Sequence, residues 1–246
     1  MSVFLVAFLI TGPSLVAGTL GGIIGTGSSL LLLPCLSLLY GSAQAIPIMA
    51  IAAVFANLGR VMAWWQEIDW RAFCFYSLGS LPGAVVGANL LVNLPAGYAD
   101  SILGGFFLLL VPLRRKWQRR GKTVASRFLP FWGLALGVLT GLVQSTGPLS
   151  VMLFSFHGLS KGVLLGTEAL TSLVVYSAKT STFSLLGTLT LELWLKGIWV
   201  GLSLMLGAFI GKRLIRSMEQ VRLVNFLDIF TTISGGLLLW QGYQGH

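Results

Sequence analysis

The chain has 246 residues, of which 55% are hydrophobic and only 9% are charged, and its formal net charge is +9. Soluble domains typically carry about 25% charged residues, so this composition excludes an ordinary soluble domain and indicates a polytopic membrane protein. Apolar runs near the roughly 20 residues that a helix needs to cross a bilayer recur along the chain, without the strict alternation of a transmembrane barrel. The positive charge does not indicate a nucleic-acid partner, because cytoplasmic loops of membrane proteins collect Lys and Arg.

The hydrophobic pattern predicts an all-helical fold made of two groups of apolar segments. The expected segments are 3–24, 28–40, 45–65, 71–93 and 98–113, followed by 128–143, 147–159, 163–187, 191–211 and 222–242. We therefore divide the chain into a first transmembrane repeat (1–113), a basic cytoplasmic loop (114–127) and a second transmembrane repeat (128–246).

The first apolar stretch contains a break. The segment GGIIGTGSSLLLLP, residues 21–34, concentrates Gly, Thr and Ser well before the first charged residue, Arg60. Glycine lowers helix propensity by about 1 kcal/mol relative to alanine, and each bare backbone group in lipid costs several kcal/mol. Such a break survives only where protein or a watery cavity covers it, so we expect it to face the interior.

Basic residues set the expected orientation. The loop 114–127 has seven basic and no acidic residues, and a second basic cluster lies between the last two segments, so both are expected in the cytoplasm. Segments 163–187 and 191–211 are two full crossings between these loops, so 128–159 must enter and leave on one side. With about 32 residues at 1.5 Å each, it is too short for two spans. It is predicted to be a re-entrant helix pair broken near QSTGPLS, residues 144–150.

The two halves of the chain match each other. GTLGGIIGTGSSL (18–30) aligns without a gap with GVLTGLVQSTGPL (137–149), and residues 69–90 align with 193–214 after a short insertion. Each repeat is then a broken re-entrant helix pair plus three transmembrane helices. Because three is odd, the repeats are inverted, and both termini are expected in the periplasm. This is the architecture of secondary transporters, whose sites lie near the midplane at the repeat interface.

Candidate anion-binding residues lie at the two breaks and at two cations within the apolar segments. Helix N-termini at the breaks would offer N–H groups and a positive dipole end to an anion. Lys179 matches Arg60 in the repeat alignment, and each follows a polar residue, Tyr176 or Asn57, by three positions. The expected binding residues are Arg60, Lys179, Asn57, Tyr176, Gly25, Thr26, Gly27, Ser28, Ser29, Gln144, Ser145, Thr146 and Gly147.

Other interpretations of these residues stay open. Small residues at the breaks could serve only close helix packing, and Arg60 could be an anchor at the cytoplasmic interface. Lys179 could pair with Glu168, and Glu168 could instead bind a coupling proton or face the loop. Asp228 in the last segment is expected to pair with an arginine such as Arg222.

Two features are interpreted as structural. Glycines recur every four residues at positions 79, 83 and 87 and at positions 133, 137 and 141, a spacing that favours close helix packing. Asp69 precedes an apolar segment and is expected to cap the N-terminus of its helix.

The order of these motifs resembles the TauE/SafE family. The resemblance rests on the glycine-rich break, the helix start at Ile68, Asp69 and Trp70, and the segment GSLPGAVVGA (79–88), with a weaker repetition in the second half. It covers essentially the full chain. The resemblance implies a bacterial inner-membrane transporter associated with the export of sulfite and organosulfonates.

We therefore expect a secondary transporter that exports a small anion by alternating access at a basic midplane site. Sulfite or an organosulfonate is the leading substrate, and other small anions such as carboxylates are the alternative. A cell interior negative by 100 mV drives each negative charge outward with about 2.3 kcal/mol, so export needs no coupling ion in principle.

An intramembrane enzyme is not expected, because the predicted apolar segments contain no G-x-S-x-G serine and no paired carboxylates; the match GLSKG (158–162) has its serine between two segments. A membrane scaffold would not need matched polar breaks. The expected partners are the anion and the lipid bilayer, with a homo-oligomer left open. No cofactor, metal ion or nucleic acid is expected.

Overall fold

Helices account for the regular structure in the computed structural model, which describes residues 3–25, 28–94, 98–118, 123–144, 146–214 and 220–244. Its helices are α1 Val3–Ile24, α2 Ser28–Tyr40, α3 Ser42–Trp64, α4 Trp70–Val92, α5 Tyr98–Gln118, α6 Leu129–Val143, α7 Gly147–Phe156, α8 Lys161–Leu185, α9 Leu191–Leu214 and α10 Gln220–Gln244, with short 3-10 helices at Trp65–Glu67 and Ser126–Phe128. The predicted all-helical fold is confirmed, and most helix boundaries lie within a few residues of those expected.

The largest boundary difference is at the end of α5. The apolar run ends at residue 113, but the helix continues to Gln118. Arg, Lys and Gln are good helix formers, and Arg114 and Arg115 bind the carboxylate of Asp228 in α10 at 2.5 and 3.1 Å. The expected pairing of Asp228 with an arginine is thus confirmed with partners from α5, while the side chain of Arg222 lies outside the described part.

Among the described residues, four helices are long and apolar enough to cross a membrane. They are Ser42–Glu67, Trp70–Val92, Ser126–Val143 and Leu191–Arg213. Large apolar side chains on their outer faces, such as Leu78, Phe131 and Leu206, are exposed, as expected for a surface covered by lipid.

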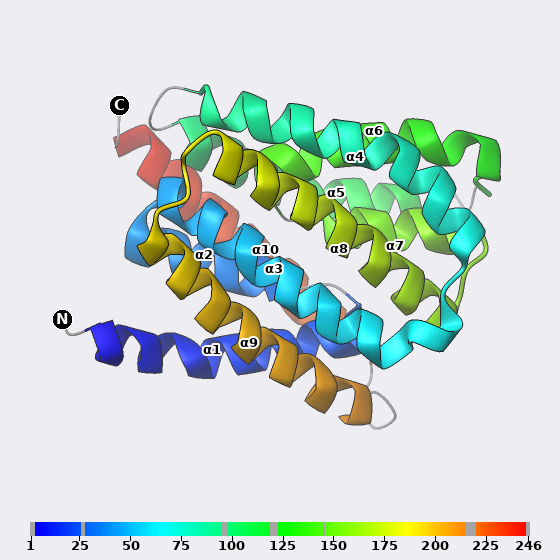
Figure 1. Cartoon of the computed structure of the whole chain (residues 1–246), viewed down its shortest axis with the longest axis horizontal. Helices are drawn as coiled ribbons and strands as arrows, with labels where there is room; N and C mark the ends of the chain where they lie inside the picture. Colours follow the sequence, from blue (N-terminus) through cyan, green and yellow to red (C-terminus); the bar gives the residue numbers. More distant parts are fainter. Residues whose placement is uncertain are drawn as a thin grey trace.

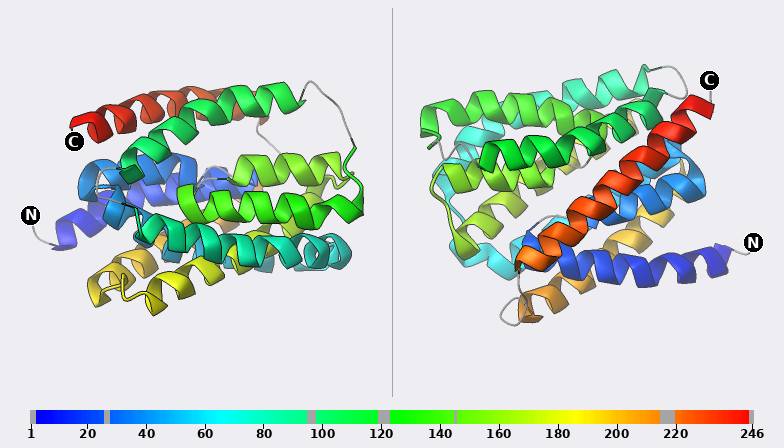
Figure 2. Two further views of the ribbon diagram at one scale, coloured as in Figure 1. Left: turned by 90° about the horizontal axis from the view of Figure 1, so that it is seen from above. Right: turned by 180° about the vertical axis from the view of Figure 1, so that it is seen from behind.

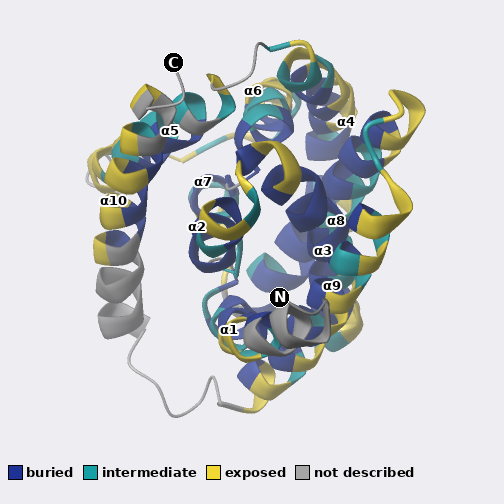
Figure 3. Ribbon diagram, turned by 90° about the vertical axis from the view of Figure 1, so that its left-hand side faces the viewer, coloured by how far each residue is buried: buried dark blue, intermediate teal, exposed yellow. Residues whose placement is uncertain are grey.

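The helices pack in a pattern that joins the two halves of the chain. α1 packs on α9, α6 packs on α4, and α3 lies against α8 (Figure 1). α5 and α10 pack on each other along one flank (Figure 3). Every residue of α3 from position 45 to position 53 is buried, so α3 and its partner α8 lie in the interior (Figure 3).

Close contact at two helix crossings depends on glycine. A Cβ on Gly79 would overlap the carbonyl oxygen of Pro130 where α4 crosses α6. At the crossing of α1 and α9, a Cβ on Gly18 would overlap the carbonyl oxygen of Leu204. The packing role predicted for the glycines of α4 and α6 is confirmed, and the α1–α9 crossing, which sequence reasoning did not single out, is built in the same way.

Basic residues of the last turns of α5 and α9 lie at one end of the helix bundle, and both chain ends that the structure describes lie at the other. α1 begins and α10 ends at one end of the bundle (Figures 1 and 2). The C-terminal ends of α5 and α9 lie at the opposite end, and their last turns carry Arg115 and Lys116 in α5 and Lys212 and Arg213 in α9. The hairpin of α1 and α2 opens toward the first end, and the hairpin of α6 and α7 opens toward the basic end (Figure 2).

The predicted cap of α4 is present. The Asp69 carboxylate accepts a hydrogen bond from the backbone N–H of Ala72 at 2.9 Å, and the Asp69 backbone N–H donates to the hydroxyl of Thr167 in α8 at 2.9 Å. Asp69 therefore satisfies an otherwise unpaired N–H of the first turn and also ties the start of α4 to α8.

Candidate functional site

Both predicted breaks occur in the structure. α1 ends just before Gly25, and α6 ends just before Gln144. At these matched positions the backbone turns to positive φ, 81° at Gly25 and 67° at Gln144. Glycine adopts this conformation readily, but Gln144 is the one non-glycine residue that does so in the described part of the chain. A side chain is thus retained at a position that favours glycine.

The two breaks border one pocket between α2, α3, α7 and α8. The residues predicted from the sequence that line it are Gly25, Ser28, Ser29, Asn57, Arg60, Gly147 and Tyr176. The other lining residues are Leu30, Ala53, Pro148, Glu168 and Ser172. The cavity measures about 30 Å³. Both halves of the chain therefore contribute to a small polar space.

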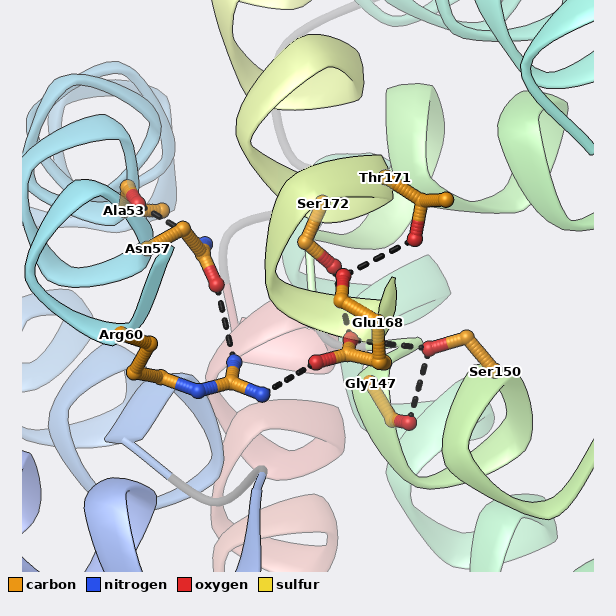
Figure 4. Close-up of polar contacts among 8 residues, drawn as sticks. All are labelled: Ala53, Asn57, Arg60, Gly147, Ser150, Glu168, Thr171 and Ser172. Carbon is orange, nitrogen blue, oxygen red and sulfur yellow. Dashed lines mark hydrogen bonds and ion pairs between the residues drawn. The ribbon is translucent and has the colours of Figure 1, made fainter. Parts of the chain in front are cut away.

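A buried ion pair crosses this pocket. A guanidinium nitrogen of Arg60 contacts Oε2 of Glu168, and Nη1 of Arg60 donates to Oδ1 of Asn57 at 2.8 Å (Figure 4). The side chains of Arg60 and Glu168 are only 10% and 1% exposed. Asn57 is itself fixed, because its Nδ2 donates to the carbonyl oxygen of Ala53 at 2.8 Å. Arg60 is thus a buried, oriented cation rather than an exposed anchor at the membrane interface.

The second oxygen of Glu168 is held by hydroxyl groups. Oε1 accepts hydrogen bonds from Ser172 at 2.7 Å and from Ser150 of α7 at 3.1 Å (Figure 4). The Ser150 hydroxyl also lies 2.9 Å from the carbonyl oxygen of Gly147. Arg60 belongs to the first half of the chain, whereas Glu168 and its serines belong to the second. The ion pair therefore joins the two halves.

Tyr176 connects the pocket with the second break. Its hydroxyl donates to the carbonyl oxygen of Gln144 at 2.5 Å. The Gln144 side chain is fully buried, and neither its amide nitrogen nor its amide oxygen has a partner among the described residues. A buried polar group without a partner costs about 1–3 kcal/mol. Gln144 thus combines an unfavourable backbone conformation with an unpaired amide, a combination that occurs at functional sites.

Lys179 does not line the pocket. It is 0% exposed, its Nζ donates to the carbonyl oxygen of Thr140 at 2.8 Å, and it lies 5.4 Å from the ring centre of Phe183. The Lys179–Glu168 pair that the sequence left open is not formed, because Glu168 binds Arg60 instead. The two cations that the repeat alignment matched therefore lie in different surroundings.

The remaining predicted residues fall into two groups. Thr146 is buried, and its hydroxyl contacts that of Thr140 near Lys179 rather than the pocket. Thr26, Gly27 and Ser145 lie outside the described residues.

Sequence reasoning missed two residues of the site, Ser150 and Ser172. Ser172 follows Glu168 by one helical turn, and that spacing could have indicated the contact. No local signal indicated Ser150, whose partner is 18 residues away.

The arrangement is suited to an oxyanion. A guanidinium presents paired N–H donors that match carboxylate and sulfonate oxygens, and Asn57 holds this group in place. α2 and α7 begin at the same pocket, and their N-termini direct the positive ends of two helix dipoles toward it. The pocket can therefore bind one small anionic group when the Glu168 carboxylate no longer occupies the guanidinium.

Comparison with known proteins identifies the family of the chain. The family model of the sulfite exporter TauE/SafE matches residues 10–238. A curated relative, the probable membrane transporter protein YunE of Bacillus subtilis (strain 168), is 25% identical over 121 residues, which cover 45% of this chain and 44% of the relative. The match thus spans less than half of that relative's length. No solved structure gives a significant match. The chain belongs to the TauE/SafE family of membrane transporters.

Proposed function

We propose that the protein is a secondary transporter that moves small anions across the bacterial inner membrane by alternating access, with Arg60 binding the anionic group. The observation that carries this proposal is a buried guanidinium beside two helix N-termini in a pocket shared by both halves of the chain. Charged side chains within a membrane are costly even when they are paired, as Arg60 is here, so they are retained mainly at functional sites. Transport rather than catalysis also fits the family.

The proposed transport mechanism rests on two inverted repeats. The first is α1 and α2 as a broken re-entrant pair with the crossings α3, α4 and α5, and the second is α6 and α7 with α8, α9 and α10. In support, exchanging the two halves converts the α1–α9 contact into the α6–α4 contact. Gly18 and Gly137, which are matched by the repeat alignment, both lie at these crossings. The two hairpins open toward opposite ends (Figure 2).

The charge distribution supports an orientation for the repeats. The basic ends of α5 and α9 lie together, so this end would face the cytoplasm. Both termini would then lie in the periplasm. α3 ends and α8 begins at the basic end, so in the proposed orientation the Arg60 pocket would lie on the cytoplasmic side of the bundle (Figure 1).

Sulfite or an organosulfonate is the substrate class that the family name supports, and export is the proposed direction. A carboxylate is the second candidate. The observation in its favour is that Arg60 already holds a carboxylate, that of Glu168, in this pocket. Fork-shaped recognition by arginine suits both classes of anion.

We propose Lys179 as a second point on the anion path. Glu168, Ser172, Tyr176 and Lys179 follow one another at intervals of four, four and three residues, a spacing that places them along one face of α8. Lys179 and the nearby Gln144 and Thr146 would meet the anion when the Arg60 pocket is closed. Thr26, Gly27 and Ser145, which neighbour Gly25 and Gln144 in the sequence, are proposed as further donors.

The test is flux into proteoliposomes that contain the purified chain, with sulfite, a small alkanesulfonate and a small carboxylate as separate substrates. Arg60→Gln should abolish flux of every anion that wild type carries, and Arg60→Lys should restore part of it. Arg127→Gln is the matched control, because Arg127 is exposed and lies over the ring of Phe128. Equal flux in wild type and Arg60→Gln would refute the proposal.

A further inference from the structure

The pocket already contains its own anion. The Glu168 carboxylate binds one terminal nitrogen of the Arg60 guanidinium and the Asn57 amide oxygen binds the other, so both nitrogens that an incoming anion would use already have partners. An anion that binds both nitrogens as a fork must displace one of these partners, and Glu168 is the partner whose negative charge repels it. Binding of substrate to Arg60 therefore requires that Glu168 leave the guanidinium.

An ionised Glu168 would be left in an unfavourable state. It would be a buried carboxylate without its cation and next to a second anion, and both desolvation and like-charge repulsion disfavour the charged form. A protonated carboxyl avoids both penalties. Ser150 and Ser172 donate to Oε1 in the structure. Their hydroxyls can rotate and instead accept a hydrogen bond from the protonated carboxyl group.

The charge balance then fixes a stoichiometry. In the structure the pocket contains one guanidinium and one carboxylate and is neutral. With one monovalent anion on Arg60 and one proton on Glu168, the pocket is neutral again. The proton adds to a carboxylate oxygen and leaves from the same oxygen, so the step involves no redox change and no further reactant.

We propose that Glu168 is a displaceable counterion that takes up one proton for each monovalent anion bound to Arg60 and releases it when the Arg60–Glu168 pair re-forms. This inference rests on the proposed transport function. Anion and proton then move together and without net charge. The direction of transport then follows the anion and pH gradients, and the membrane potential, which would drive a lone anion outward, exerts no force on the coupled step.

The surroundings of Glu168 contain few other groups that could take this role. On α7 it meets only the non-titrating Ser150. α6 has no titratable residue. Among the described residues, the titratable groups that interact with Glu168 are Arg60 from α3, Tyr76 from α4 and Tyr176 from α8 itself. Glu67 lies beside Gly162, the backbone of Asp69 binds Thr167, and Lys179 of α8 binds Thr140. Arg71 and Cys74 of α4 are exposed.

The first experiment uses the wild-type protein in detergent in a weakly buffered solution, with a small alkanesulfonate as the probe. Sulfonates stay ionised across the neutral range, so a proton that disappears from solution must bind to the protein. We expect uptake of one proton per sulfonate bound. Sulfonate binding that depends on Arg60 but takes up no proton would overturn the coupling and leave the transport proposal intact. Sulfonate binding that is equal in wild type and Arg60→Gln would refute the transport proposal itself.

The second experiment compares variants in proteoliposomes with an internal pH dye. Glu168→Gln mimics the protonated form, so anion movement should lose its accompanying proton and respond to an imposed membrane potential. Glu192→Gln is the control, because this exposed carboxylate pairs with Lys196 on the surface of α9 and should leave the coupling unchanged. If Glu168→Gln does not fold, Ser172→Ala, which removes one hydroxyl partner of the carboxyl, should shift the pH dependence of flux. Undiminished proton movement in Glu168→Gln, or an unshifted profile in Ser172→Ala, would contradict the proposal.

Discussion

Arg60, Glu168 and Lys179 are charged residues buried among apolar helices, and their partners differ. Arg60 and Glu168 neutralise each other, whereas Lys179 has a carbonyl oxygen and an aromatic ring as its partners and no carboxylate among the described residues. Breaking a buried pair by removing one partner typically costs about 3–5 kcal/mol, because the other charge is left uncompensated. Substitutions at the three positions should therefore affect stability very differently.

Lys179→Gln should leave the protein folded. Removal of the Lys179 amine leaves no carboxylate unpaired, so the melting temperature in detergent should stay near that of wild type. Anion flux should be strongly reduced. Adding Glu168→Gln should not restore flux. Loss of stability in Lys179→Gln that is repaired by Glu168→Gln would show instead that Lys179 neutralises Glu168, and normal flux in Lys179→Gln would remove it from the anion path.

At the scale of helices, local sequence patterns were sufficient to predict where elements lie. Clustered Gly, Ser and Thr marked the two breaks, and apolar runs marked the helices to within a few residues. The extension of α5 was missed because hydropathy ends at the basic residues while helix propensity continues. Partners far apart in sequence were missed as well, because a single sequence has no local signal for the contact of Arg60 with Glu168, which is 108 residues away.

The helix crossings lead to a stability prediction. Gly79→Ala places a Cβ where the carbonyl oxygen of Pro130 lies, so α4 and α6 must move apart. Overpacking of this kind typically costs about 1–3 kcal/mol. Gly105→Ala in α5 is the control, because a Cβ there meets nothing within 4 Å and alanine favours the helix. Thermal unfolding in detergent should show a lower melting temperature for Gly79→Ala than for Gly105→Ala, and the reverse order would contradict the described crossing.

At the scale of the whole molecule, the proposed inverted repeats explain several observations together. They account for the exchange of packing partners between the halves, for hairpins that open toward opposite ends and for basic residues gathered at one end. They also explain why the matched cations differ in surroundings. Glu168 corresponds to Met49 in the repeat alignment, so only one of the two cations has a carboxylate opposite it.

The proposed topology predicts a labelling pattern in intact cells. With Cys35 and Cys74 replaced, a single cysteine at position 2 should react with a membrane-impermeant reagent, because both termini are proposed to be periplasmic. A single cysteine at Gln118, at the basic end of α5, should react only after the cells are opened. Labelling of position 118 in intact cells together with protection of position 2 would show that the orientation is the reverse of the one proposed.

The central claim is that a transported anion takes the place of Glu168 on Arg60, and a structure with bound substrate tests it most directly. A small alkanesulfonate that contains a heavy halogen atom can be located without ambiguity. We predict that the sulfonate oxygens lie within hydrogen-bond distance of the Arg60 guanidinium, between the N-termini of α2 and α7, with the Glu168 carboxyl turned away. A sulfonate bound elsewhere while the Arg60–Glu168 pair remains intact would contradict the account.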